Sequence, residues 1–198
     1  MSYLKKIEYE IILKDSFLII RSCPKCGRKT HFLNTKKFRI NANGSKLDIW
    51  LIYQCEVCRH TFKLAIYERQ KVSSIPKEEY KHFLENNEQL AEAFGKNIQL
   101  FLKNKADIDF EKMQYAFVKK NESIESSGFE EQIAVTINNP FGLKIRPEKQ
   151  IAEVLGLSRS QVKSLLEEGK IELLEKTKAS SQNIRFYAKA NPKISYEH

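Results

Sequence analysis

Four cysteines in two closely spaced pairs constrain this chain more than any other feature. Cys23-Pro24-Lys25-Cys26 and Cys55-Glu56-Val57-Cys58 contain all the cysteines of the sequence, and residues 27–54 separate the two pairs. Each C-x-x-C turn presents two thiolates from one short loop, so two such turns supply the four ligands of a tetrahedral zinc ion. We therefore predict a Zn²⁺ site made by Cys23, Cys26, Cys55 and Cys58.

The donor set predicts a structural role for this metal. Four thiolates close the coordination shell, whereas a catalytic zinc keeps one position open for water. Redox chemistry is disfavoured because the pairs lie between strand-like runs and not at a helix start. His31 and His60 lie near the pairs and are expected outside the coordination shell. Arg59 occupies the position after the second pair that Gly27 occupies after the first. If that position needs a positive φ, arginine there lowers stability by on the order of 1 kcal/mol.

The first segment, residues 1–75, reads as strand and predicts an antiparallel zinc ribbon. Short β-type runs at 7–14 and 17–21 lead into the first pair of cysteines. Runs at 36–42 and 46–54 flank Asn43-Gly44, which is a strong signal for a tight turn. A further run at 61–67 leaves the second pair with alternating apolar residues.

The charge of +9 is unevenly distributed along the chain. Residues 1–75 carry +9, residues 76–140 carry −4 and residues 141–198 carry +4. Basic ends of this size suggest nucleic acid, because cations that neutralise phosphates release counterions. The alternative is a protein of high isoelectric point with solvated lysines.

The hairpin between the cysteine pairs carries the candidate nucleic-acid residues of this first segment. Strand alternation places Lys37 and Arg39 on a solvent-exposed face, opposite the face of Phe38 and Ile40. Trp50 lies in a run that is apolar on both faces, so we expect it in the core and do not name it as a base-stacking residue.

The middle segment, residues 76–140, predicts helices that begin after Pro76, followed by short strands at 114–119 and 132–137. The polar stretch 121–128 is expected to form a loop. We find no phosphate-binding glycine loop and no nucleophile motif, so the chain is expected not to be an enzyme. The beginning of the sequence contains no apolar run typical of a signal peptide or a membrane span, which predicts a cytoplasmic protein without membrane contact.

The third segment, residues 141–198, predicts a pair of short helices. Pro147 and Gly156 bound the first, and Ser158 with Gln161 forms a capping box for the second. Arg159, Lys163 and Lys170 remain outside the buried stripe, and cations beside free helix amides suit phosphate oxygens.

This stretch resembles the small RNA-binding domain named after ribosomal protein S-four. The resemblance rests on Ile145-Arg146 before the first helix and on LGLSRSQVKSLLEEGKI at 155–171. It implies a small α/β domain that binds structured or ribosomal RNA, with RNA-facing positions at Arg146, Ser158, Arg159, Lys163 and Lys170. The family usually continues into a valine-asparagine-glycine turn, whereas this chain has Glu172-Leu173-Leu174-Glu175.

Two alternatives stay open beside RNA binding. Ala152, Gly156 and Val162 have the spacing of a DNA-binding helix-turn-helix at 147–168, which would make the chain a transcriptional regulator. The second alternative is a protein-interaction scaffold whose zinc is purely structural. Either a monomer or a dimer is compatible with the sequence.

Across its full length the chain is also similar to an uncharacterised bacterial family, a domain of unknown function of about this size. The shared features are CPKCG, the Asn-Ala-Asn-Gly hairpin, the second C-x-x-C and the Leu-Ser-Arg-Ser helix. The fold expected overall is α+β, with a zinc ribbon, a helical middle that includes short strands, and a C-terminal domain of the S-four type.

Overall fold

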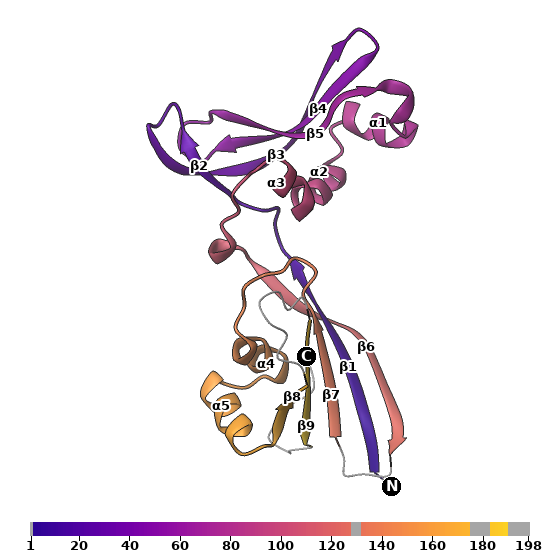
Figure 1. The fold of residues 1–198 in the computed structure, drawn as a ribbon, viewed down its shortest axis with the longest axis vertical. Coiled ribbons are helices and arrows are strands. Elements are labelled where there is room, and N and C mark those ends of the chain that lie inside the picture. Colours follow the sequence, from indigo (N-terminus) through magenta and orange to yellow (C-terminus); the bar gives the residue numbers. More distant parts are fainter. Residues whose placement is uncertain (1, 128–131, 175–182, 190–198) are drawn as a thin grey trace. The chain divides into compact units, whose positions relative to one another are not determined.

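The computed structural model describes residues 2–127, 132–174 and 183–189, which form an α+β fold with five α-helices. It divides into two compact units (Figure 1). The cysteine unit is Leu13–Gln114, and the terminal unit combines Met1–Ile12 with Tyr115–His198. The domain boundaries expected at 75/76 and at 140/141 each fall inside one of these units. The two units of the structure therefore differ from the three consecutive segments expected from the sequence. The reason is a strand pairing between distant parts of the chain, described below.

A four-stranded antiparallel sheet forms the cysteine unit, in the order β2-β3-β4-β5. The strands are β2 (Ile19–Cys23), β3 (Arg28–Asn43), β4 (Lys46–Cys55) and β5 (Thr61–Lys71). Asn43 pairs with Lys46 across the β3–β4 turn, where Gly44 has φ 60°, as the Asn-Gly signal predicts. Alternation along β4 buries one face of the sheet completely through Leu47, Ile49, Leu51 and Tyr53.

Three short helices cover this buried face (Figure 1). They are α1 (Lys77–Leu84), α2 (Glu88–Gly95) and α3 (Ile98–Lys103). Phe83 of α1 meets Phe38 edge-on at 4.8 Å between ring centroids, and Phe101 of α3 meets Tyr53 at 5.9 Å. The helical stretch expected as a separate middle segment is therefore the cover of the sheet that carries the cysteines. Two 3-10 helices, η1 (Val72–Ser74) and η2 (Phe110–Lys112), complete this unit.

The terminal unit contains a mixed five-stranded sheet in the order β6-β1-β7-β9-β8. The strands are β1 (Ser2–Leu13), β6 (Tyr115–Ser127), β7 (Gln132–Asn138), β8 (Ile171–Leu173) and β9 (Asn183–Lys189). β1 runs parallel to β7 with Ile7 opposite Val135, and β7, β9 and β8 are antiparallel neighbours.

Two expectations are corrected by this sheet. The run at 7–14 does not belong to the sheet of the cysteine pairs, because its buried residues Ile7 and Ile11 lie in a strand that pairs with β7. Residues 121–127 extend β6 and do not form a loop.

The helix pair of the terminal unit follows the predicted boundaries. α4 (Pro147–Leu155) ends at Gly156, which has φ 64°. α5 (Arg159–Glu167) begins at the Ser158 cap, and both hydrogen bonds of the capping box with Gln161 are present. Within the ranges described above, every helix is too short or too polar to cross a membrane.

Candidate functional site

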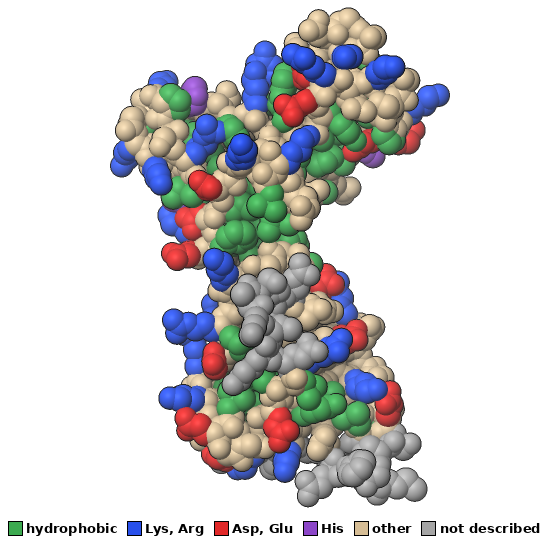
Figure 2. Space-filling model, viewed as in Figure 1, with side chains coloured by type: hydrophobic (Ala, Val, Ile, Leu, Met, Phe, Trp, Pro, Cys, Tyr) green, Lys and Arg blue, Asp and Glu red, His purple; other side chains and the backbone are tan. Residues whose placement is uncertain are grey.

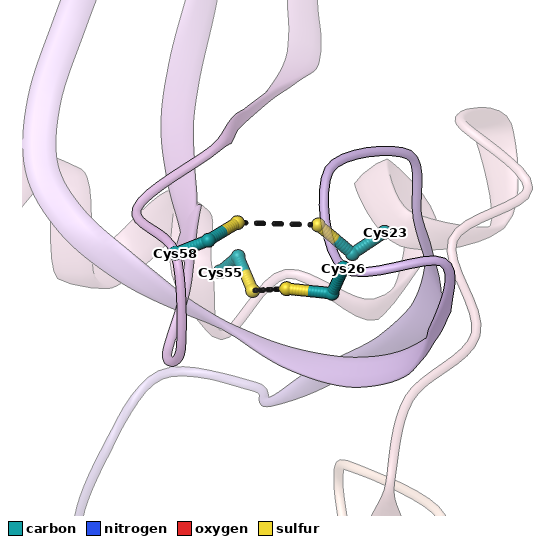
Figure 3. A group of neighbouring side chains, drawn as sticks. All are labelled: Cys23, Cys26, Cys55 and Cys58. Atoms are coloured by element: carbon teal, nitrogen blue, oxygen red, sulfur yellow. Dashed lines mark hydrogen bonds between the residues drawn. The ribbon is translucent and has the colours of Figure 1, made fainter.

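The four cysteines converge on one point although they come from two separate turns (Figure 3). Their Sγ atoms all lie within 4.8 Å of one another, with 3.4 Å between Cys23 and Cys58 and 3.9 Å between Cys26 and Cys55. Metal–sulfur bonds of about 2.3 Å in a tetrahedron place the sulfurs about 3.8 Å apart. The cysteines are free thiols, and a disulfide would need about 2.05 Å between sulfurs. The cluster therefore fits a single metal ion.

The two C-x-x-C turns have the same backbone geometry. The N–H of Gly27 donates to the carbonyl of Cys23 at 2.9 Å, and the N–H of Arg59 donates to the carbonyl of Cys55 at 3.1 Å. Gly27 has φ 65° and Arg59 has φ 62°, so the second turn needs the left-handed conformation even though it lacks glycine. Pairing of β3 with both β2 and β4 brings these two similar turns together.

Neighbouring groups bias the thiols toward different protonation states. Burial works to raise the pKa of Cys55, but hydrogen bonds from the Thr30 hydroxyl, 3.2 Å away, and from backbone N–H groups of the turn outweigh it and lower the pKa to about 6. Hydrogen bonding with Cys58, followed by burial, raises the pKa of Cys26 to about 12. A metal that binds here meets one thiol that ionises readily and one that must release its proton.

Neither nearby histidine belongs to the sulfur cluster. The ring of His31 lies between two carboxylates, with Nε2 2.9 Å from Oδ2 of Asp109 and Nδ1 3.1 Å from Oε1 of Glu56. The hydrogen bond with His31 is the main reason why the pKa of Asp109 lies below its usual value. His60 is exposed, and its backbone carbonyl accepts from the N–H of Cys55 at 2.8 Å. Both histidines therefore support the turns and leave the four sulfurs as the candidate donor set.

Lys37 and Arg39 lie on the face of the sheet opposite the helices. We call this the open face and define it by Lys37, Arg39, Lys46, Asp48, Trp50, Ile52 and Lys63. Lys37 and Arg39 are exposed and pair across the ladder with Ile52 and Trp50 of β4. The same register places Lys63 of β5 opposite Ile52. Paired residues share a face, so these side chains form one surface.

Trp50 corrects the expectation of a core tryptophan. It is half-buried on the open face, and the ammonium of Lys63 lies 4.7 Å from the centroid of its ring. The apolar run of β4 looked buried on both faces, but only the side that faces the helices is fully covered. Alternation from Ile49 and Leu51, combined with the register fixed by the Asn43-Gly44 turn, is the signal that would have placed Trp50 beside Arg39.

The C-terminal candidate residues lie on the helix pair of the terminal unit. All five are exposed: Arg146, Ser158, Arg159, Lys163 and Lys170. Ser158 is engaged as the cap of α5. Lys170 pairs with Glu168 at 2.6 Å and Lys163 lies 3.9 Å from Glu167. Arg146 and Arg159 have no carboxylate partner within the described part of the chain, so these two arginines are the most available cations of the pair.

Comparisons with known proteins identify a family. No curated protein and no solved structure matches the chain. A family model described as "Protein of unknown function (DUF1062)" matches residues 40–177, which is more than half of the sequence. The matched segment includes the second cysteine pair and the α4–α5 helices and begins after the first cysteine pair. The chain therefore belongs to the DUF1062 family.

Proposed function

We propose that this chain is a non-enzymatic RNA-binding protein whose four cysteines hold one structural Zn²⁺ ion. The observation that supports RNA binding most is the open face of the sheet. Lys37, Arg39 and Lys46 are exposed there, and none of the ion pairs between described residues involves them. Cations that are not neutralised by carboxylates are available to phosphate oxygens.

Asp48 of β4 alternates onto the open face, whereas Glu88 and Glu92 lie on α2, on the helical side of the sheet. Lys36, the neighbour of Lys37, points to that side and pairs with Glu92 at 2.7 Å and Glu88 at 3.3 Å on α2. Figure 2 shows Lys and Arg side chains spread over the visible surface of this unit, with Asp and Glu in smaller groups. The carboxylates of α2 therefore engage Lys36, whereas no ion pair between described residues engages Lys37, Arg39 or Lys46, which leaves these three cations to a polyanion.

Zinc is the metal that suits this donor set. Four thiolates form a soft, tetrahedral shell without an open position, which is typical of a structural zinc ribbon. When bound, the ion supplies a cross-link between the β2–β3 turn and the β4–β5 turn. The residues of the chain supply the rest, because Thr30 and the backbone N–H groups of both turns stabilise negative charge on sulfur.

We also propose a second RNA contact of the S-four type on α4 and α5. The order of helix, helix and strand in α4, α5 and β8 agrees with that resemblance. Arg146 precedes α4 and Arg159 begins α5, so both cations lie beside helix N-termini, where free N–H groups also attract phosphate.

Duplex DNA is the second candidate ligand, since α4 and α5 have the spacing of a helix-turn-helix. That motif normally needs another helix packed behind the pair. The terminal unit contains two α-helices among its described residues, which favours RNA over DNA.

Fluorescence anisotropy with a labelled RNA stem-loop tests the proposal. If the open face contacts about four phosphates of the stem, the salt slope is about −3.6, and affinity falls about 150-fold between 50 and 200 mM salt. The double variant Lys37→Ala/Arg39→Ala removes two contacts, and its affinity should fall only about 12-fold over the same range. Arg159→Ala/Lys163→Ala should weaken binding regardless of RNA sequence.

The matched control is Lys77→Ala/Lys81→Ala on α1, which removes the same charge from the helical side. It should keep the wild-type salt slope. Absence of salt-dependent RNA binding at low ionic strength contradicts the proposal, and a preference for duplex DNA by a dimer supports the regulator instead. Co-purification with a protein that survives nuclease treatment would favour the interaction scaffold.

A further inference from the structure

We infer that the open face binds single-stranded RNA with at least one base stacked on Trp50. This inference rests on the proposed function, and it specifies that the sheet selects single-stranded RNA. Trp50 lies in β4, an inner strand of the four-stranded sheet, and is half-buried with its ring facing away from the helices. An indole in this position offers a flat apolar surface whose edges are held by neighbouring strands.

The surroundings of Trp50 arrange apolar and cationic groups in separate rows. Trp50 and Ile52 form an apolar row along β4, and Asp48 precedes them on the same face, where its Oδ1 accepts from the N–H of Arg69. Lys37 and Arg39 flank this row on β3, and Lys63 flanks it on β5. A strand of RNA has the complementary composition, because its bases are apolar on their faces and its backbone carries one negative charge for each phosphate.

The contact between Lys63 and the Trp50 ring shows that the ring is accessible to a cationic or π-bearing group. The ammonium of Lys63 lies 4.7 Å from the ring centroid, and the Lys63 side chain is exposed. An exposed cation–π contact is worth only about 0.5–1 kcal/mol, which is less than the stacking of one base on an aromatic side chain. A base can therefore take the place of the ammonium, and Lys63 can turn to a phosphate.

Single strands fit this surface better than duplexes. In a duplex the faces of the bases are stacked on one another, so only phosphates and groove edges remain for a sheet. Unpaired bases can turn their faces to Trp50 while the backbone follows Lys37 and Arg39 or Lys63. The open face should consequently bind duplex RNA through charge alone and single-stranded RNA through charge and stacking.

The only tryptophan of the sequence makes this inference directly measurable. Intrinsic fluorescence of the full-length protein is titrated with a single-stranded RNA 12-mer, with the same 12-mer annealed to its complement, and with polyphosphate. We expect the single strand to quench Trp50 and the duplex and polyphosphate to bind without comparable quenching. A single-stranded DNA 12-mer separates recognition of the sugar from recognition of the bases.

Variants of Trp50 give the second measurement. Trp50→Leu should weaken binding of the single strand about 5- to 100-fold and change duplex binding little, whereas Trp50→Phe should keep most of the affinity. Lys77→Ala on the helical side is the control that should leave both unchanged. The quenching experiment uses the unmodified protein, so it decides the question even if Trp50→Leu does not fold.

The outcomes separate this inference from the proposed function. RNA binding without quenching, or equal loss of single-strand and duplex binding in Trp50→Leu, overturns stacking but leaves RNA binding intact. Absence of binding to all RNA probes overturns both. Quenching by an acidic peptide and not by RNA would assign the open face to a protein partner and contradict the inference.

Discussion

Free zinc should set the stability of the cysteine unit. Only the folded sheet brings the two cysteine pairs within 4.8 Å of each other, so the ion binds the native state in preference to the unfolded chain. Once free zinc exceeds the dissociation constant, each tenfold increase adds about 1.4 kcal/mol to the free energy of unfolding. For a unit of about 100 residues this corresponds to a rise in Tm of about 5 to 11 °C.

Trp50 reports on this unit alone, because it is the only tryptophan and lies within Leu13–Gln114. Its fluorescence is followed during thermal unfolding in zinc buffers of graded free concentration, with a phosphine reductant. Cys55→Ser should lower the Tm and reduce its dependence on zinc. Val57→Ser changes an exposed residue of the same turn and should keep both. A Tm that is independent of free zinc, or an unchanged slope in Cys55→Ser, would refute the reasoning.

Three further outcomes follow from the geometry of the same unit. Gly27→Ala should lower the free energy of unfolding by about 1 kcal/mol, because the added Cβ meets no atom within 4 Å and only the positive φ is unfavourable. Arg59→Gly should raise the free energy of unfolding by up to about 1 kcal/mol, because glycine adopts the positive φ of this position without strain. Urea titration of both variants measures these opposite changes. Asn104→Ala removes three hydrogen bonds to the backbone of Ala65 and Leu100 and should cost about 2–3 kcal/mol by the same assay. Zinc binding at pH 7 should release at least one proton, because the pKa of Cys26 is raised to about 12. Zinc affinity should therefore fall as pH falls. Calorimetry in two buffers of different ionisation enthalpy counts the released protons.

Sequence motifs of only a few residues predicted the local structure correctly. The two C-x-x-C turns, the Asn43-Gly44 turn and the capping box of Ser158 with Gln161 each occur where the sequence indicated. These motifs fix the backbone through their own hydrogen bonds and require little from the rest of the chain. The candidate metal site belongs to this class, because its spacing alone identified all four residues.

Long-range pairing could not be predicted in the same way. β1 alternates as a strand, but nothing in residues 2–13 shows that its neighbour is β7, with Ile7 opposite Val135. A strand pattern indicates which residues are buried, not which distant strand completes the sheet. The consecutive segments suggested by charge therefore cut through both compact units and separated β1 from its own sheet.

The adjacent residues Lys36 and Lys37 show why charge summed along a sequence is a poor guide to a binding surface. The ladder between β3 and β4 is interrupted between Asn34 and Lys37, where Lys36 has φ 58°, and the two lysines point to opposite faces. Lys36 is held by Glu92 and Glu88, and this pairing raises its pKa, whereas Lys37 faces solvent on the open face. The charges of residues 1–75 are thus divided between two units and between the two faces of this sheet, and a polyanion that approaches the side where Trp50 is accessible meets Lys37 and Arg39 there.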